Sequence, residues 1–143
     1  MPDPEQITTA RDLNILATAL VRDFPPQEFP ELYPMFAEKN FTYNGIKQGN
    51  RNPLVYGTQA ADGLKTGHTE EAGYGLVGSA ARDGQRVVMV LNGMTSMKQR
   101  SSESRRLMDL MFREFRLYKF FDAGEPIDHA NVWLGASGKV GLV

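Results

Sequence analysis

The chain has 143 residues, of which 41% are hydrophobic and 23% are charged, a composition typical of a soluble globular protein. Its 16 basic and 17 acidic residues are spread along the sequence and give a net charge of -1, which argues against a nucleic-acid partner. No apolar run reaches the roughly 18 residues that a membrane span needs, and no signal-peptide pattern is present. The absence of cysteine excludes disulfides and thiolate chemistry. We expect no cofactor and no metal.

The first expected element is an amphipathic helix over residues 7–21. Four apolar residues recur at helical spacing and share one face, namely Leu13, Leu16, Ala17 and Leu20. Thr9 and Asp12 have the spacing of a helix-capping pair. Pro25 and Pro26 end the helix, because proline lacks the N–H and disfavours helical geometry in the residue before it.

The next stretch predicts little regular structure. A short element is expected over residues 29–39, and a strand over residues 41–43. Glycine, asparagine and proline then punctuate the sequence as far as residue 56, which favours an irregular loop.

The middle of the chain predicts a β-hairpin. Two strand-like runs, residues 74–81 and 85–92, flank Asp83-Gly84, and Asp-Gly is a strong hairpin signal. The run 87–91 is continuously apolar, as expected for a central strand covered on both faces. We therefore expect helices on both sides of the sheet.

A second helix is expected from Ser96, which forms a capping box with Gln99, to about residue 116. Its predicted buried stripe comprises Met108, Met111, Phe112 and Phe115. Beyond residue 119 the pattern changes to what looks like the start of another β unit. About 25 residues bury too little surface to form a domain alone.

Lys65-Thr66-Gly67 is the stretch with the clearest chemistry. On an edge strand, the lysine supplies fixed positive charge and the threonine hydroxyl can hydrogen-bond a carboxylate. The glycine leaves the strand surface bare, so that an extended peptide can lie along it. Lys65 and Gly67 point to the same face of such a strand.

Residues 62–74 read Asp-Gly-Leu-Lys-Thr-Gly-His-Thr-Glu-Glu-Ala-Gly-Tyr and closely resemble the D-alanyl-D-alanine carboxypeptidases, the low-molecular-weight penicillin-binding proteins of peptidase family S11. Residues 33–39, 41–45 and 50–54 extend the similarity over essentially the whole chain. The resemblance implies an α/β (α+β) fold with an antiparallel sheet flanked by helices, part of the penicillin-binding-protein and β-lactamase-like transpeptidase fold. It implies the C-terminal half of the catalytic domain in residues 1–118 and the start of a small all-β domain in residues 119–143.

The resemblance also implies roles for individual residues. Lys65 is expected to be catalytic, and the backbone N–H of His68 is expected to form the oxyanion hole. Thr66, Gly67 and Arg51 are expected to bind substrate, with Arg51 orienting a carboxylate or Lys65. Asp62 and Gly63 are expected to shape the turn before the strand.

The sequence departs from the family because it contains neither Ser-x-x-Lys nor Ser-x-Asn. We therefore expect a fragment that is inactive alone and exposes apolar surface. The intact enzyme would act on peptidoglycan pentapeptide ending in D-Ala-D-Ala, be acylated by β-lactams, and work in the periplasm or on the outer face of the cytoplasmic membrane. Two alternatives stay open: a non-catalytic module that binds peptidoglycan or D-Ala-D-Ala, and a β-lactamase relative.

Overall fold

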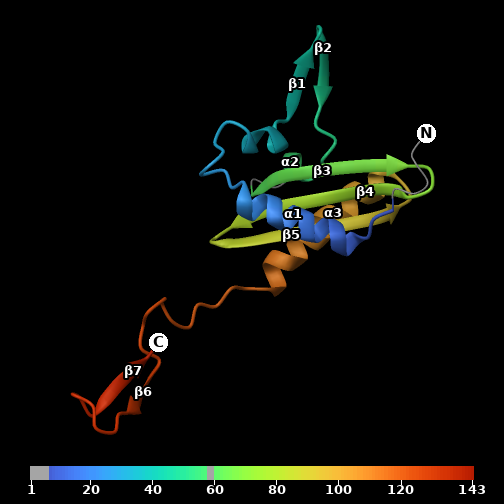
Figure 1. Cartoon of the computed structure of the whole chain (residues 1–143). Coiled ribbons are helices and arrows are strands. Elements are labelled where there is room, and N and C mark those ends of the chain that lie inside the picture. Colours follow the sequence, from blue (N-terminus) through green and yellow to red (C-terminus); the bar gives the residue numbers. More distant parts are fainter. Residues whose placement is uncertain (1–6, 58–59) are drawn as a thin grey trace.

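The computed structural model describes residues 7–57 and 60–143. A three-stranded sheet forms the body, and two small hairpins project from it (Figure 1). In chain order, the elements before the sheet are α1 (Ala10–Asp23), the 3-10 helix η1 (Tyr33–Ala37), β1 (Asn40–Tyr43), β2 (Ile46–Gly49) and α2 (Leu54–Gly57). The sheet and the elements after it are β3 (Ala61–Thr69), β4 (Gly73–Arg82), β5 (Gln85–Met94), α3 (Met97–Glu114), β6 (Asp128–Asn131) and β7 (Lys139–Leu142).

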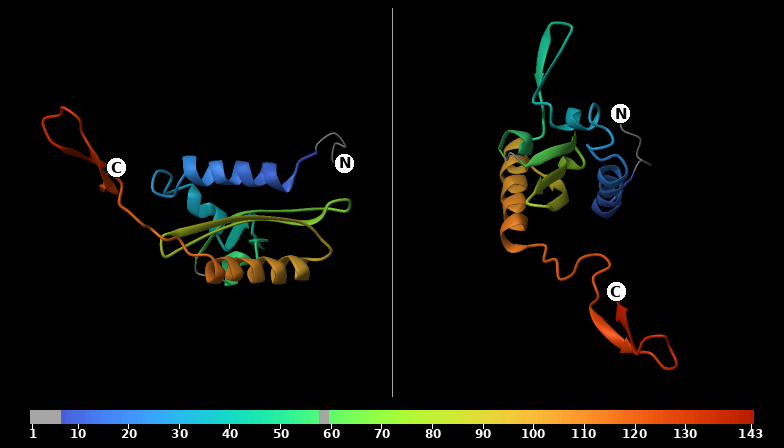
Figure 2. Two further views of the ribbon diagram at one scale, coloured as in Figure 1. Left: turned by 90° about the horizontal axis from the view of Figure 1, so that it is seen from below. Right: turned by 90° about the vertical axis from the view of Figure 1, so that its left-hand side faces the viewer.

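The sheet is antiparallel, with the strand order β3-β4-β5. Helix α1 covers one face and α3 covers the other (Figure 2). This arrangement confirms the predicted fold class of an antiparallel sheet flanked by helices. One detail of the prediction is wrong: in the described residues the central strand is β4, and β5 lies at an edge. The apolar run of β5 is explained by α1 and α3, because these helices cover both faces of the strand.

Two clusters of buried side chains hold the layers together. The larger one lies between the sheet and α3, and comprises Leu54, Leu76, Ala80, Val87, Met94 and Met108. The smaller one comprises Ala17, Val21 and Leu64, with Val77 and Val88 packed against it. Alternate residues of β4 and β5 therefore serve opposite layers, as the side-chain period of a strand requires.

Helix α1 covers Ala10–Asp23, so it begins three residues and ends two residues later than the predicted 7–21, although its capping pair is as predicted. Thr9 and Asp12 form a reciprocal capping box, and the helix stops at Asp23, before the two prolines. The predicted face is wrong at Leu16, which is 64% exposed. The packed face is rotated toward Val21, because α1 meets the sheet along Ala17 and Val21.

Helix α3 begins after Ser96, whose side-chain oxygen accepts a hydrogen bond from the Gln99 N–H at 3.1 Å. Met108 is fully buried, and Met111 and Phe112 pack against the same cluster, as predicted. Phe115 is exposed, contrary to the prediction, because the helix ends at Glu114 and the backbone of Phe115 is extended.

The irregular loop predicted after residue 43 is wrong in two places. Strands β1 and β2 form a hairpin around Asn44-Gly45, and the short helix α2 follows it. Both turn residues have positive φ, 48° and 75°, which is the geometry that Asn-Gly favours in two-residue hairpins. The Asp83-Gly84 turn, with φ values of 50° and 78°, has the same geometry and was predicted.

The β unit predicted beyond residue 119 takes the form of an antiparallel hairpin, β6–β7, which lies apart from the sheet at the end of an extended segment (Figure 1). The division into domains at residue 118 stays a prediction. Within the described residues, no helix is long and apolar enough to cross a membrane.

Candidate functional site

The Lys-Thr-Gly residues lie in β3, as predicted, at one end of the strand order. A shallow hollow of about 510 Å³ opens beside them. It is lined by Arg51, Lys65, Thr66, Gly67, His68, Tyr74, Met97 and Arg100. The structure thus brings together every residue that the sequence proposed for the site, although Arg51 and residues 65–68 come from two separate segments of the chain.

The register of β3 against β4 places neighbouring site residues on opposite faces of the sheet. Lys65 lies opposite Val77, which packs on the α1 side, and Thr66 lies opposite Leu76, which belongs to the α3 side. Because consecutive residues of a strand alternate, Lys65 and Thr66 stand on opposite faces of β3. The hollow therefore wraps around the edge of β3 that pairs with no strand among the described residues, called the free edge below. A Cβ built on Gly67 would meet no atom within 4 Å, so glycine leaves this part of the strand bare.

Arg100, in the first turns of α3, is a site residue that the sequence did not reveal. It is only 6% exposed, and its guanidinium donates to the backbone oxygens of Arg51 at 3.1 Å and of Gly67 at 3.5 Å. Its Nε is buried and has no hydrogen-bond partner among the described residues. Arg100 therefore connects the loop before α2 to the Lys-Thr-Gly strand, while its Nε–H donates to none of the described residues.

An aromatic pair completes the α3 side of the hollow. The rings of His68 and Tyr74 lie with their centroids 3.9 Å apart, and the guanidinium of Arg100 lies 5.5 Å from the Tyr74 centroid. Cation–π attraction of this kind holds a guanidinium in place without neutralising its charge. The ring of His68 is thus a packing partner of Tyr74.

The hollow is positively charged. Lys65, Arg51 and Arg100 line it, and no Asp or Glu is among its lining residues. Burial lowers the pKa of Arg100, and the nearby charge of Arg51 lowers it further, although a guanidinium remains protonated at neutral pH. Clustered cations that lack carboxylate partners favour an anionic ligand.

Asp62 and Gly63 do not shape a turn before the strand, contrary to the prediction. Both lie inside β3, where the pairing with β4 shifts by one residue between Ala61 and Gly63. Asp62 is the extra residue of this β-bulge.

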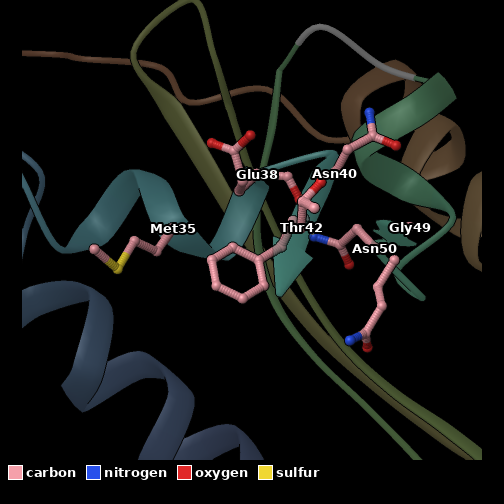
Figure 3. Close-up of a pocket in the computed structure, with 8 residues that line it drawn as sticks. Met35, Glu38, Asn40, Thr42, Gly49 and Asn50 are labelled. Atoms are coloured by element: carbon pink, nitrogen blue, oxygen red, sulfur yellow. Dashed lines mark hydrogen bonds between the residues drawn. The ribbon is translucent and has the colours of Figure 1, made fainter. Parts of the chain in front are cut away.

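Another hollow, of about 590 Å³, lies between η1 and the base of the β1–β2 hairpin (Figure 3). Glu38 is the one ionisable residue in its lining, and Asn50 uses its side-chain N–H groups on the backbone oxygens of Phe36 and Glu38. We interpret it as a gap between packed elements, since the side chain of Asn50 bonds to the backbone of the chain itself. Within residues 7–57 and 60–143, no three His, Cys, Asp or Glu side chains cluster as a metal site would require.

Comparison with known families identifies the protein family to which the Lys-Thr-Gly strand belongs. Residues 1–96 match the family model Peptidase S11, D-alanyl-D-alanine carboxypeptidase. The chain belongs to this family. The family match includes β3 and the Lys-Thr-Gly residues of the S11 chain.

Curated relatives are similar over almost the whole S11 chain. D-alanyl-D-alanine carboxypeptidase DacA of Haemophilus influenzae is 40% identical over 99% of the chain, and DacA of Escherichia coli K12 is 38% identical over 96%. The chain spans about a third of the length of these relatives, 35% and 33%.

Solved structures share the fold. Penicillin-binding protein 5 of H. influenzae superposes with a TM-score of 0.80 and 38% identity, over 99% of the S11 chain and 40% of the other. Penicillin-binding protein D2 of Listeria monocytogenes, solved in cefotaxime-bound and ampicillin-bound forms, superposes with a TM-score of 0.64 and 31% identity, over 77% of the S11 chain.

Proposed function

We propose that the chain supplies the substrate-binding wall of a serine-type D-Ala-D-Ala carboxypeptidase that acts on peptidoglycan stem peptides. The observation that carries the proposal is the hollow at the free edge of β3, where Lys65, Arg51 and Arg100 converge without a carboxylate among the lining residues. A peptide that ends in D-Ala-D-Ala carries one carboxylate at its terminus, and this cationic edge is complementary to it.

Each site residue has a role in this proposal. An extended peptide adds to the free edge of β3, along the bare surface of Gly67. The Thr66 hydroxyl and the Arg100 guanidinium, both on the α3 side, bind the terminal carboxylate, and Arg51 adds charge at the rim. Lys65 is the catalytic cation beside the reacting carbonyl, and the backbone N–H of His68 serves as an oxyanion-hole donor.

The reaction needs a serine nucleophile with an adjacent base, and the 143 residues contain neither Ser-x-x-Lys nor Ser-x-Asn. We propose that a serine outside these residues attacks the penultimate D-Ala carbonyl, forms an acyl-enzyme and releases the terminal D-Ala, and that water then hydrolyses the ester. β-Lactams would acylate the same serine. Such chemistry belongs in the periplasm or on the outer face of the cytoplasmic membrane.

Binding of a short peptide ending in D-Ala-D-Ala tests the proposal on the chain itself. We expect amide chemical shifts of residues 65–68 to move on titration, and the C-terminally amidated peptide to bind at least about tenfold more weakly, since a charge-assisted hydrogen bond is lost. Lys65→Ala should weaken binding similarly. Lys47→Ala, an exposed lysine of β2, is the matched control. Equal binding of the free and amidated peptides would contradict the proposal.

The serine part of the proposal has a separate test. Fluorescent penicillin should not label the isolated chain covalently, because its residues lack the serine motifs. Labelling of this chain would place a nucleophile within it. In a longer protein that contains this chain, hydrolysis of nitrocefin faster than peptide cleavage would favour a β-lactamase relative instead.

A further inference from the structure

We infer that Asp62, Arg86 and Tyr33 form a positioning device that fixes the register of the Lys-Thr-Gly residues against β4, an inference that rests on the proposed function. These three residues come from β3, β5 and η1. None of them lines the hollow at the β3 edge. They act through the strand that carries Lys65.

An ion pair crosses the central strand of the sheet. Arg86 Nη1 donates to Asp62 Oδ2 at 2.6 Å, and on the way across β4 it also donates to Ser79 Oγ at 2.7 Å. Ser79 is fully buried, and the two charged side chains are only 30% and 25% exposed. A charge pair this enclosed is screened less by solvent than the exposed pairs on the helices.

Tyr33 holds the same carboxylate oxygen from the other side. The Tyr33 hydroxyl donates to Asp62 Oδ2 at 3.1 Å, and Tyr33 itself is 3% exposed. The neighbouring Phe36 leaves no room beside β3, since a Cβ on Gly63 would lie 3.0 Å from the Phe36 Cβ. Thus η1 packs directly onto the segment that contains Asp62.

The position of Asp62 explains why so many partners converge on it. Ala61 pairs with Ala80 and Gly63 pairs with Ser79, so Asp62 is the inserted residue of the bulge. A shift of one residue moves every following side chain to the other face of a sheet. With the bulge, Lys65 lies opposite Val77 and Thr66 opposite Leu76. Without it, each of these residues would lie opposite the neighbouring position of β4.

A β-bulge locally interrupts the ladder of backbone hydrogen bonds, so side-chain partners of its extra residue stabilise it. Here those partners are Arg86, Tyr33 and, through Arg86, Ser79. The side chain of Asp62 thus links buried residues of the sheet to the strand that carries Lys65, Thr66 and His68.

The test is Asp62→Asn, which keeps the shape and removes the charge. We expect the affinity for a peptide ending in D-Ala-D-Ala to fall by at least about tenfold, the scale of a hydrogen bond between charged groups. In a Lys65→Ala background the same substitution should cost less affinity than in the wild type, because part of its effect is exerted through Lys65 and the rest through Thr66. Glu103→Gln, which breaks the exposed pair with Arg106, is the matched control and should leave affinity unchanged.

A second variant and a second readout keep the test decisive. Arg86→Met removes the charge and the Nη1 group that donates to both Asp62 and Ser79, so it should also weaken binding. NMR contacts between Lys65 and Val77 across β3 and β4 should diminish in both variants. This readout needs no ligand, so it still tests the inference if the wild-type chain does not bind the peptide, which would count against the proposed function alone. Unchanged Lys65–Val77 contacts, or an additive loss in the Lys65→Ala background, would overturn the inference.

Discussion

The three-stranded sheet and the two hairpins are built from the same kind of backbone pairing but differ in what their side chains contact. In the sheet, apolar residues of β4 and β5 are covered by α1 on one face and α3 on the other. In the β1–β2 hairpin, Phe41, Tyr43 and Ile46 are exposed, and in the loop after β6 the residues Trp133 and Leu134 are 89% and 91% exposed. Strand pairing alone thus does not create a core in this molecule.

The difference shows that stability in this chain comes from layers. A two-stranded hairpin without a covered face is marginal in water, whereas three strands that pack against helices can be stable on their own. The candidate site lies at the edge of the layered part, on β3. We therefore expect the site to share the stability of the sheet and the hairpins to open locally at much lower cost.

The largest expected contrast comes from the same substitution made in both regions. Leu76→Ala, at a position that is 1% exposed, should destabilise the chain by about 2–5 kcal/mol, because it removes buried methyl groups and leaves a cavity. Leu134→Ala should change the free energy of unfolding by less than about 0.5 kcal/mol. Denaturant unfolding measures both. Similar losses would mean that the hairpin contributes to a core.

Glycine substitutions compare how tightly the sheet and the C-terminal hairpin are packed. A Cβ on Gly78 of β4 would lie 2.7 Å from Leu54 Cδ1, so Gly78→Ala should cost about 1–3 kcal/mol through overpacking. A Cβ on Gly138, next to β7, meets no atom within 4 Å, so Gly138→Ala should be close to neutral. Thermal unfolding of the two variants compares them, and a neutral Gly78→Ala would show that Leu54 can move aside.

Two serines test the contrast through hydrogen bonds. Ser96 caps α3, and Ser96→Ala should cost about 1 kcal/mol, because the Gln99 N–H loses its acceptor. Ser137 donates to the Lys139 oxygen in the exposed C-terminal hairpin, and its replacement by alanine should cost only a few tenths of that. Urea midpoints report the difference. Equal costs would indicate that the hairpin bond is as important as the helix cap.

The smallest effect concerns pH. Burial and the charge of Asp62 raise the pKa of Tyr33 above its ordinary value. The unfolded chain loses this proton near pH 10 while the folded chain still binds it, so stability should fall as the pH rises above about 10. Tyr33→Phe should make the alkaline fall shallower, with Tyr43→Phe, at an exposed hairpin position, as the matched control. Melting temperatures between pH 8 and 11 measure it, and identical slopes in wild type and Tyr33→Phe would contradict it.

Much of the fold follows from short-range signals. The Thr9–Asp12 capping box, the Asp83-Gly84 turn and the Ser96 cap each depend on residues a few positions apart, and each lies where the sequence predicts it. The β1–β2 hairpin was missed although Asn44-Gly45 carries the same turn signal. Its strands lack an alternating buried face, so the pattern around the turn did not read as a hairpin.

Tertiary partners account for the other misses. Helical spacing put Leu16 on the apolar stripe, but the spacing does not say which part of that stripe the sheet covers. The Lys-Thr-Gly strand was predicted from its motif, and Arg51 from the family pattern. Arg100 was not, because the carbonyls that it contacts lie 33 and 49 residues away in the sequence and form no local pattern.

The confinement of Arg100 has a consequence for the thermodynamics of recognition. Its guanidinium is already held by two backbone oxygens and the face of Tyr74, so its long side chain loses rotamer freedom when the chain folds. A ligand that approaches the edge of β3 therefore meets a cation whose ordering costs nothing further. Pre-organisation of this kind lowers the dissociation rate more than it raises the association rate. We therefore expect Arg100 to affect the residence time of a bound ligand most strongly.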